Sequence, residues 1–152
     1  MRFAVGSDHA GFPLKKVVID DLRAAGHDVA DLGTNDPSVP SDYPDVAEAV
    51  CEAIRAGKAD RGIILCGSGV GVGVAANKFP GIRAGVCHDH YSAHQGVEHD
   101  DVNVLCIGAR VIGPELARDV VAAFAGARFS EEERHRRRLA KVLAFERRYQ
   151  RD

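Results

Sequence analysis

The sequence predicts an α/β fold in three layers, with a five-stranded parallel sheet covered by helices on both faces (an α/β/α sandwich). Short apolar runs alternate with segments whose apolar residues recur at helical spacing, as in repeated strand–helix–strand units. The apolar runs alternate little with polar residues, which is typical of strands buried on both faces. At 152 residues the chain can form one core, so we expect a single domain over residues 1–152.

Five apolar runs are the predicted strands. They are short and are bounded by glycine, proline or charged residues, as strands of a small sheet usually are. In chain order they are Arg2–Gly6, His27–Leu32, Arg61–Cys66, Ile82–Cys87 and Asn103–Ile107.

Helical segments lie between these strands. The first carries Leu14 and Leu22 on one face and is followed by Gly26, a residue that commonly ends helices. Pro44 and Pro114 stand where two further helices should begin. The predicted helices are Pro13–Ala25, Tyr43–Ile54, Val74–Lys78, His90–His99 and Pro114–Ala125, with a loop over Gly33–Asp42.

The C-terminal segment, residues 130–152, breaks this alternation because no strand follows it. It is predicted as one long charged helix with Leu139, Leu143 and Tyr149 on a stripe. Ser130 to Glu133 fit a capping box with an acidic first turn. We expect this extra helix to pack on a partner subunit.

Charge and hydropathy argue against several classes of protein. The formal net charge is −2 and the pI is about 6.4, which argues against general binding of nucleic acid or of an anionic membrane. No apolar run approaches the roughly 18 residues of a membrane span, and Asp8 and His9 interrupt any signal-peptide pattern. We expect a cytoplasmic protein with neither nucleic acid nor membrane as a partner.

The most informative motif follows the third predicted strand and is called the glycine ladder below: Cys66-Gly67-Ser68-Gly69-Val70-Gly71-Val72-Gly73. Glycine lets backbone N–H groups approach an anion closely, and a strand–turn–helix directs them at it. A thiol in such surroundings loses its proton more easily, so Cys66 is a candidate nucleophile or base. The widely spaced Cys51, Cys87 and Cys106 are expected to be buried, reduced and inert.

The ladder also matches a loose dinucleotide-binding pattern, Gly71-x-Gly73-x-x-Ala76. That fingerprint normally follows the first strand, whereas this match follows the third, and the chain leaves no room for a catalytic partner domain. A non-catalytic module that binds a nucleotide or another phosphorylated ligand stays open as an alternative.

Residues that follow predicted strands should meet at the carboxyl edge of the sheet, where ligands of such sheets bind. They are Asp8-His9, the glycine ladder, His88-Asp89 and Gly108–Arg110. We expect the histidines to gather there too, including His99, which could serve as an acid or base near neutral pH. His90 and His94 have a spacing that metal ligands use, but an exposed helix face is the favoured interpretation, and no metal site is predicted.

Arg134 and Arg138 lie four residues apart on the predicted tail helix and share a face. Two guanidinium groups on one face can hold a phosphate through several charge-assisted hydrogen bonds. Pairing with the acidic residues 131–133 on a solvated face is the other interpretation, and the pattern alone favours it.

Together these residues resemble the type B ribose-5-phosphate isomerases, in their cysteine-type form, within the ribose and galactose phosphate isomerases. The matching stretches run in family order over nearly the whole chain. They are Gly6–Gly11, Asp42-Tyr43-Pro44, Cys66–Gly71, Ala75–Lys78, Gly81–Ala84, Asn103–Leu105, Gly108–Arg110, and Arg134-His135 with Arg138.

The resemblance implies a Rossmann-like sandwich and an aldose–ketose isomerase of phosphosugars that needs neither cofactor nor metal. The simplest substrate pair is D-ribose 5-phosphate and D-ribulose 5-phosphate, joined by an enediolate. The resemblance further implies a homo-oligomer, dimer or tetramer, whose active sites are shared between subunits through the tail helix. An isomerase of a hexose 6-phosphate or a tetrose phosphate is the nearest alternative.

The resemblance also implies roles for individual residues. Cys66 would move a proton between C2 and C1, and His99 would assist ring opening. Asp100 is expected at the substrate, where relatives commonly have asparagine, and this difference leaves the preferred sugar open. The enediolate oxygens would be held by Ser68 and the backbone of Gly67, Gly69 and Gly71, the sugar hydroxyls by Asp8 and Tyr43, and the phosphate by His9, Arg110, Arg134 and Arg138.

Overall fold

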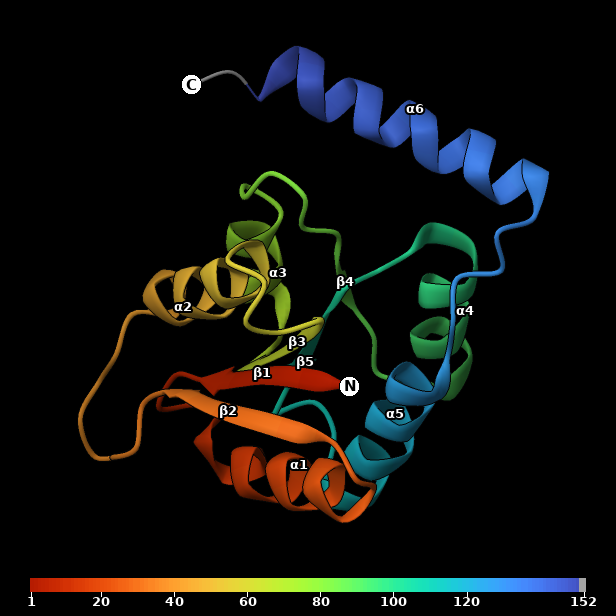
Figure 1. Cartoon of the computed structure of the whole chain (residues 1–152). Helices are drawn as coiled ribbons and strands as arrows, with labels where there is room; N and C mark the ends of the chain where they lie inside the picture. Colours follow the sequence, from red (N-terminus) through yellow and green to blue (C-terminus); the bar gives the residue numbers. More distant parts are fainter. Residues whose placement is uncertain (151–152) are drawn as a thin grey trace.

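Five parallel strands form the central sheet in the order β2-β1-β3-β5-β4 (Figure 1). They are β1 (Arg2–Ser7), β2 (Asp28–Gly33), β3 (Arg61–Cys66), β4 (Ala84–Val86) and β5 (Val104–Gly108). The structure, a computed structural model, describes residues 1–150. Because every pairing is parallel, the carboxyl ends of the strands share one edge, as predicted.

The described residues form six helices: α1 (Phe12–Ala24), α2 (Tyr43–Arg55), α3 (Val70–Ala76), α4 (His90–Asp100), α5 (Pro114–Gly126) and α6 (Glu133–Tyr149). Helices α2 and α3 cover one face of the sheet, and α1, α4 and α5 cover the other, which confirms the predicted three layers (Figure 1). Helix α6 lies outside these layers. Within residues 1–150, no helix has the length and apolarity needed to cross a membrane.

A separate hydrophobic core fills each side of the sheet. Ile63 and Leu65 of β3 point to the side of α1, α4 and α5, whereas Ile64 between them points to α2 and α3. All three are fully buried, and burying each such side chain contributes roughly 1.5–3 kcal/mol. Burial on both faces explains why these strands lack the polar alternation of a one-sided sheet.

Helix α3 begins at Val70, four residues before the predicted start at Val74. Gly69, with φ of +81°, turns the chain directly into the helix, so the rest of the ladder is helical rather than extended loop. The small ladder residues let α3 pack closely, since a Cβ at Gly73 would lie 3.0 Å from the Val86 side chain. The helix ends at Ala76, and the side-chain amide of the next residue, Asn77, donates to the carbonyls of Gly73 and Ala84.

Strand β4 is shorter than the predicted Ile82–Cys87. It lies at the edge of the sheet and pairs only with β5, so the strand ends where its backbone diverges from that of β5. Ile82 belongs to a turn instead, donating its N–H to Phe79, although its side chain is buried as a strand residue's would be.

The predicted capping box at Ser130 is wrong. The Ser130 hydroxyl accepts the N–H of Glu132 and bonds to the ring of His135, and α6 starts only at Glu133. The backbone N–H of Ser130 donates to Glu98 of α4 at 3.0 Å. Ser130 therefore anchors the start of α6 to the end of α4 instead of capping the helix.

Helix α3 also ends at Ala76, two residues before the predicted Lys78. Helix α6 ends at Tyr149, and residues 151–152 of the predicted tail helix lie outside the described residues. The other predicted boundaries agree with the structure to within one residue.

Candidate active site

Predicted site residues from three strand ends meet at the carboxyl edge of the sheet. They line a cavity of about 480 Å³ above β1, β3 and β5, called the Cys66 cavity below. Eight of the thirteen predicted site residues line it: Asp8, His9, Tyr43, Cys66, Gly67, Ser68, Gly71 and Arg110.

Cys66 ends β3, is 5% exposed and lines this cavity. The sulfur accepts the N–H of Gly69 at 3.1 Å. The carbonyls of Cys66 and Gly67 in turn accept the N–H groups of Ala109 at 2.8 Å and Arg110 at 3.0 Å. The ladder therefore holds the sulfur, and the turn after β5 holds the backbone of Cys66 and Gly67.

The other three cysteines are free and buried, as predicted. Burial raises the pKa of the Cys51 thiol to about 12, and it also raises the pKa of Cys87 and of Cys106. These groups stay protonated at neutral pH and line no part of the Cys66 cavity. Among the four cysteines, only Cys66 is placed to react there.

Glycine in the ladder makes room for two side chains of the site. A Cβ at Gly67 would lie 3.3 Å from Nη1 of Arg110, and one at Gly71 would lie 3.1 Å from the Tyr43 ring. The guanidinium of Arg110 and the ring of Tyr43 thus lie directly against the backbone that leads from Cys66. A larger residue at either position would push these groups outward.

His9 and Ser41 fix one another across the cavity wall. The N–H of His9 donates to the Ser41 hydroxyl, and the N–H of Ser41 donates to Nδ1 of His9, both at 3.1 Å. Because Nδ1 accepts, the proton of the neutral ring is on Nε2, which can donate to an anion. Asp8 is held by the N–H of Gly11 at 2.8 Å.

Of the other five predicted residues, Gly69 touches the cavity only through its N–H bond to the Cys66 sulfur. The other four, His99, Asp100, Arg134 and Arg138, do not line the Cys66 cavity of the same chain. Helix α4 begins at the carboxyl edge with His90 and carries His99 away from it, by about 14 Å over nine residues. The expectation that His99 lies at the same edge as Cys66 is therefore wrong within one chain. The predicted site is divided between two places on the molecule.

The second place is a cluster where the end of α4 meets the start of α6. The His99 ring stacks on that of His135, with 4.1 Å between centroids, and its Nδ1 is 2.9 Å from Nε2 of Gln95. His135 is 1% exposed, and its burial, followed by the neighbouring His99, lowers its pKa. The sequence interpretation gave neither His135 nor Gln95 a role, although Gln95 lies one helical turn before His99.

The arginines of α6 have different surroundings. Arg134 pairs with Glu132 at 3.0 Å, in keeping with the solvated-face interpretation. Within residues 1–150, neither Arg138 nor Arg110 has a carboxylate at ion-pair distance. Two guanidinium groups, one at the Cys66 cavity and one on α6, are thus left without a neutralising side chain of the described chain.

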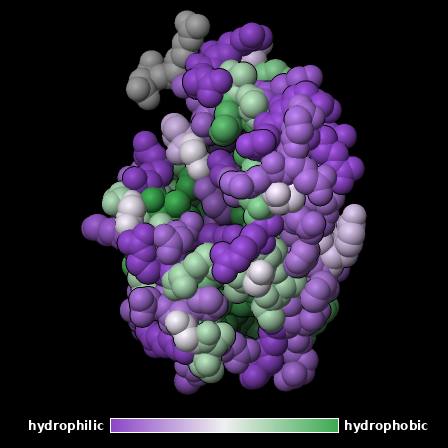
Figure 2. Space-filling view, turned by 45° about the vertical axis from the view of Figure 1, so that its right-hand side comes forward, coloured by the Kyte–Doolittle hydropathy of each residue, from purple (hydrophilic) through white to green (hydrophobic). Residues whose placement is uncertain are grey.

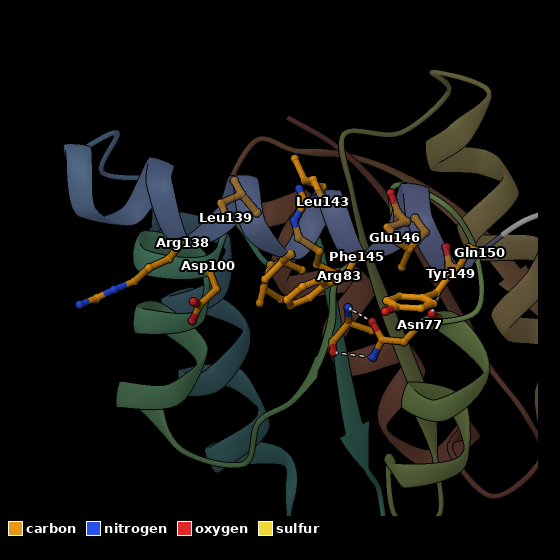
Figure 3. A pocket seen from close by; sticks show the side chains of 14 residues that line it. Asn77, Arg83, Asp100, Arg138, Leu139, Leu143, Phe145, Glu146, Tyr149 and Gln150 are labelled. Carbon is orange, nitrogen blue, oxygen red and sulfur yellow. Dashed lines mark hydrogen bonds between the residues drawn. The ribbon is translucent and has the colours of Figure 1, made fainter.

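Arg138 stands at one end of a groove of about 520 Å³ between α6 and the rest of the domain (Figure 3). Hydrophobic side chains collect in the hollow beneath α6 (Figure 2). Phe145 and Tyr149 line this groove and yet are 57% and 74% exposed. Polar contacts join α6 to the domain near its end, where Glu146 accepts the N–H of Gly81. The apolar face of α6 is therefore mostly uncovered in one chain.

His90 and His94 lie on an exposed helix face, as favoured from the sequence. Their Nδ1 atoms contact Asp119 at 3.0 Å and Glu98 at 3.1 Å. In the described part of the chain, no three His, Cys, Asp or Glu side chains converge in the way that ligands of a metal ion do.

Comparison with known proteins agrees with the fold. Residues 3–142 match the Ribose/Galactose Isomerase family. The chain is 46% identical over 147 residues to ribose-5-phosphate isomerase B of Escherichia coli, covering 97% of each chain. It is 43% identical over 129 residues to D-erythrulose-4-phosphate isomerase of Pectobacterium atrosepticum, covering 85% of each.

A solved structure of ribose-5-phosphate isomerase B from Clostridium thermocellum has 44% sequence identity and a TM-score of 0.94, covering 98% of this chain and 99% of that one. These matches extend over almost the whole chain, including both the Cys66 cavity and the start of α6. The chain therefore belongs to the ribose/galactose isomerase family and is a phosphosugar isomerase of the aldose–ketose type.

Proposed function

We propose that this enzyme interconverts D-ribose 5-phosphate and D-ribulose 5-phosphate, with Cys66 as the base. The observation that supports it most is that one cavity holds the Cys66 thiol, the ladder and two anion-binding groups, His9 and Arg110. A proton acceptor and a phosphate site are thereby offered to opposite ends of one small sugar. The relative from E. coli and the solved structure from C. thermocellum, both ribose-5-phosphate isomerases B by name, agree with this choice.

In the proposed reaction the open-chain aldose lies with C1 and C2 at Cys66. The thiolate removes the proton from C2, the C–H electrons form the C1=C2 double bond, and the carbonyl oxygen on C1 becomes an oxyanion. The thiol then returns the proton to C1, while the C2 hydroxyl gives its proton to the oxygen on C1. C2 thereby becomes the ketone, C1 carries an alcohol, and Cys66 is again a thiolate. No net oxidant or reductant is needed, because the two carbons exchange oxidation states.

Ser68 can stabilise the enediolate through its hydroxyl. Its Oγ already accepts the N–H of Val70 at 3.2 Å, which leaves the hydroxyl proton available for a substrate oxygen. The N–H of Gly69 is directed at the sulfur, so it serves Cys66 before it serves the substrate. Losing one preorganised donor of this kind typically lowers kcat by about 100- to 1,000-fold.

We also propose that two copies of the chain complete each site. His99, Arg134 and Arg138 are distant from Cys66 in one chain, Arg138 lacks a carboxylate partner in the described chain, and the apolar face of α6 is uncovered. A second copy seated on this face would bring His99 and Arg138 of the partner subunit to the Cys66 cavity. Burial of Phe145 and Tyr149 would contribute to holding the copies together.

Replacement of Cys66 by alanine tests the chemistry. Turnover of ribose 5-phosphate should fall by at least about 100-fold, since general bases typically contribute factors of about 100 to 10,000, while the affinity for the sugar phosphate stays close to that of the unaltered enzyme. Cys87→Ala is the matched control, because that thiol is buried outside the cavity. An active Cys66→Ala protein would remove the proposed mechanism.

A tetrose phosphate is the second candidate substrate, because the relative from P. atrosepticum is named for D-erythrulose 4-phosphate and matches almost as well. The two substrates differ by one carbon between the reacting end and the phosphate. Values of kcat/KM for four-, five- and six-carbon phosphosugars would decide between them. A higher value for erythrulose 4-phosphate than for ribose 5-phosphate would replace our first choice.

A further inference from the structure

His88 follows β4 and has no part in the proposed reaction, yet its ring reaches the edge of the site. Its Nε2 accepts the backbone N–H of Gly108 at 2.8 Å. Because a backbone N–H can only donate, the ring is neutral in this contact and carries its proton on Nδ1. Burial of the ring lowers the pKa of His88, which favours the same neutral form.

The His88 imidazole supplies a hydrogen-bond acceptor that a neighbouring strand would otherwise provide. Gly108 pairs with Cys66 on one side, but on the other side the pairing of β4 with β5 ends at Val86 and Cys106. Two residues further along, where Gly108 would face His88, the chain after β4 has turned into α4 and the side chain supplies the acceptor. Without that ring, the Gly108 N–H would lose its acceptor at the end of the sheet.

Gly108 is in turn the point where β5 touches the glycine ladder. A Cβ on Gly108 would lie 2.5 Å from the backbone carbon of Ser68, far closer than atoms can approach. From the opposite side, a Cβ on Gly69 would lie 3.2 Å from the Gly108 nitrogen, the very atom that His88 holds. Because these backbones touch, a displacement of Gly108 would displace Ser68 and Gly69 as well.

The next two residues carry this contact to both ends of the substrate site. Ala109 donates to the Cys66 carbonyl and Arg110 to the Gly67 carbonyl, so a shift of Gly108 would move the turn that supports them. Arg110 is the cation of the Cys66 cavity, and its guanidinium lies over Gly67. The thiol, the Ser68 hydroxyl and the phosphate-binding arginine all depend on one turn.

We propose that His88 is a positioning residue: by holding the N–H of Gly108, it sets Ser68 and Arg110 relative to Cys66. This inference rests on the proposed isomerase function. It assigns the role to the acceptor atom of the ring, so a residue that supplies an acceptor at the same reach should replace histidine, and an apolar residue of similar size should not.

The test compares His88→Leu, which removes the acceptor, with His88→Gln, whose amide oxygen reaches about as far as Nε2. His90→Leu is the matched control, since His90 is exposed and bonds only to Asp119. Steady-state kcat and KM for ribose 5-phosphate, the melting temperature, and amide hydrogen exchange of a peptide containing Gly108 are measured for each variant.

His88→Leu should lose at least about tenfold in kcat/KM, because misplacing reacting groups by about 1 Å can cost up to about 100-fold, and Gly108 should exchange faster. His88→Gln should recover most of the activity and slow exchange, and His90→Leu should match the unaltered enzyme. If His88→Leu does not fold, His88→Asn takes its place, because its amide is too short to reach Gly108.

Unchanged kinetics and exchange in the variant without an acceptor would overturn the proposal, and so would a glutamine variant as impaired as the leucine variant. Failure of the proposed function looks different. In that case the unaltered protein isomerises no phosphosugar, while the exchange of Gly108 still reports whether His88 holds it.

Discussion

The rings of His99 and His135 stack at 4.1 Å and join two helices that carry different parts of the predicted site. His99 belongs to α4, and His135 lies between Arg134 and Arg138 on α6. Ser130 reinforces the same junction by bonding to the His135 ring and to the Glu98 carbonyl. The ring-opening histidine and the phosphate-binding arginines of the proposed mechanism are thus held as one body.

Replacing His135 by leucine should loosen this body without touching the Cys66 cavity. We expect the melting temperature to fall and kcat/KM for ribose 5-phosphate to fall about tenfold, because His99 and the arginines lose their fixed relation. A sharper measurement compares kcat/KM for the ring form of the substrate with kcat/KM for an analogue fixed in the open-chain form. The value for the open-chain analogue should fall less, because that analogue needs no ring opening by His99. Equal losses for both would mean that His135 does not act through His99.

A shared site predicts complementation between two inactive variants. Cys66→Ala removes the base and Arg138→Ala removes a phosphate ligand, so each protein alone should be nearly inactive. In a mixed dimer one site carries both changes and the other carries neither. Random pairing makes half the dimers mixed, so activity should recover to about one quarter of that of the unaltered enzyme. Recovery is measured after co-refolding, and its absence would indicate a site built within one chain.

Gly71→Ala should disturb Tyr43 specifically. The new Cβ would lie 3.1 Å from the ring, and the ring can move away because Tyr43 is partly exposed. We therefore expect a higher KM for ribose 5-phosphate and little change in the melting temperature. Gly126→Ala is the control, because a Cβ there meets nothing within 4 Å. Kinetic constants and melting temperatures of both variants check this. A normal KM for Gly71→Ala would show that Tyr43 does not contact the sugar.

Stability should decrease as the pH is lowered below about 6.5. Burial lowers the folded-state pKa of His27, His88 and His135 below the ordinary histidine value of about 6.5, so the unfolded chain binds protons first as the pH falls. The contribution of these three neutral histidines to the free energy of unfolding is fully present above about pH 6.5. It is lost progressively as the pH falls toward their lower folded-state pKa values. Melting temperatures between pH 8 and pH 5.5 test the sign, and His135→Asn should flatten the dependence.

The sequence was informative about elements whose pattern is strong. The apolar strands and the glycines and prolines at helix ends predicted the layers and placed most boundaries correctly, because burial and backbone freedom act locally. It could not predict that α3 starts inside the ladder, since glycine permits loop and helix alike. Nor could it show that Ser130 does not cap the helix, because its hydroxyl bonds to the imidazole of His135 five residues later.

The candidate site divides in the same way. Asp8, His9 and Arg110 follow strands and Cys66 ends one, so the parallel sheet alone brings them together. His99 was misplaced because it lies near the end of helix α4, whose length carries it away from that edge. The roles of His88 and His135 depend on contacts across 20 residues or more, His88 with Gly108 and His135 with His99, which no local pattern records.

Helix α6 lies outside the layers of its own domain, and this has a consequence for how the enzyme behaves in dilute solution. If two copies complete each site, as proposed above, the enzyme works only while the copies remain associated. Specific activity should then decline on dilution below the dissociation constant of the assembly and be rescued by fresh protein, even by protein whose own cysteine has been alkylated.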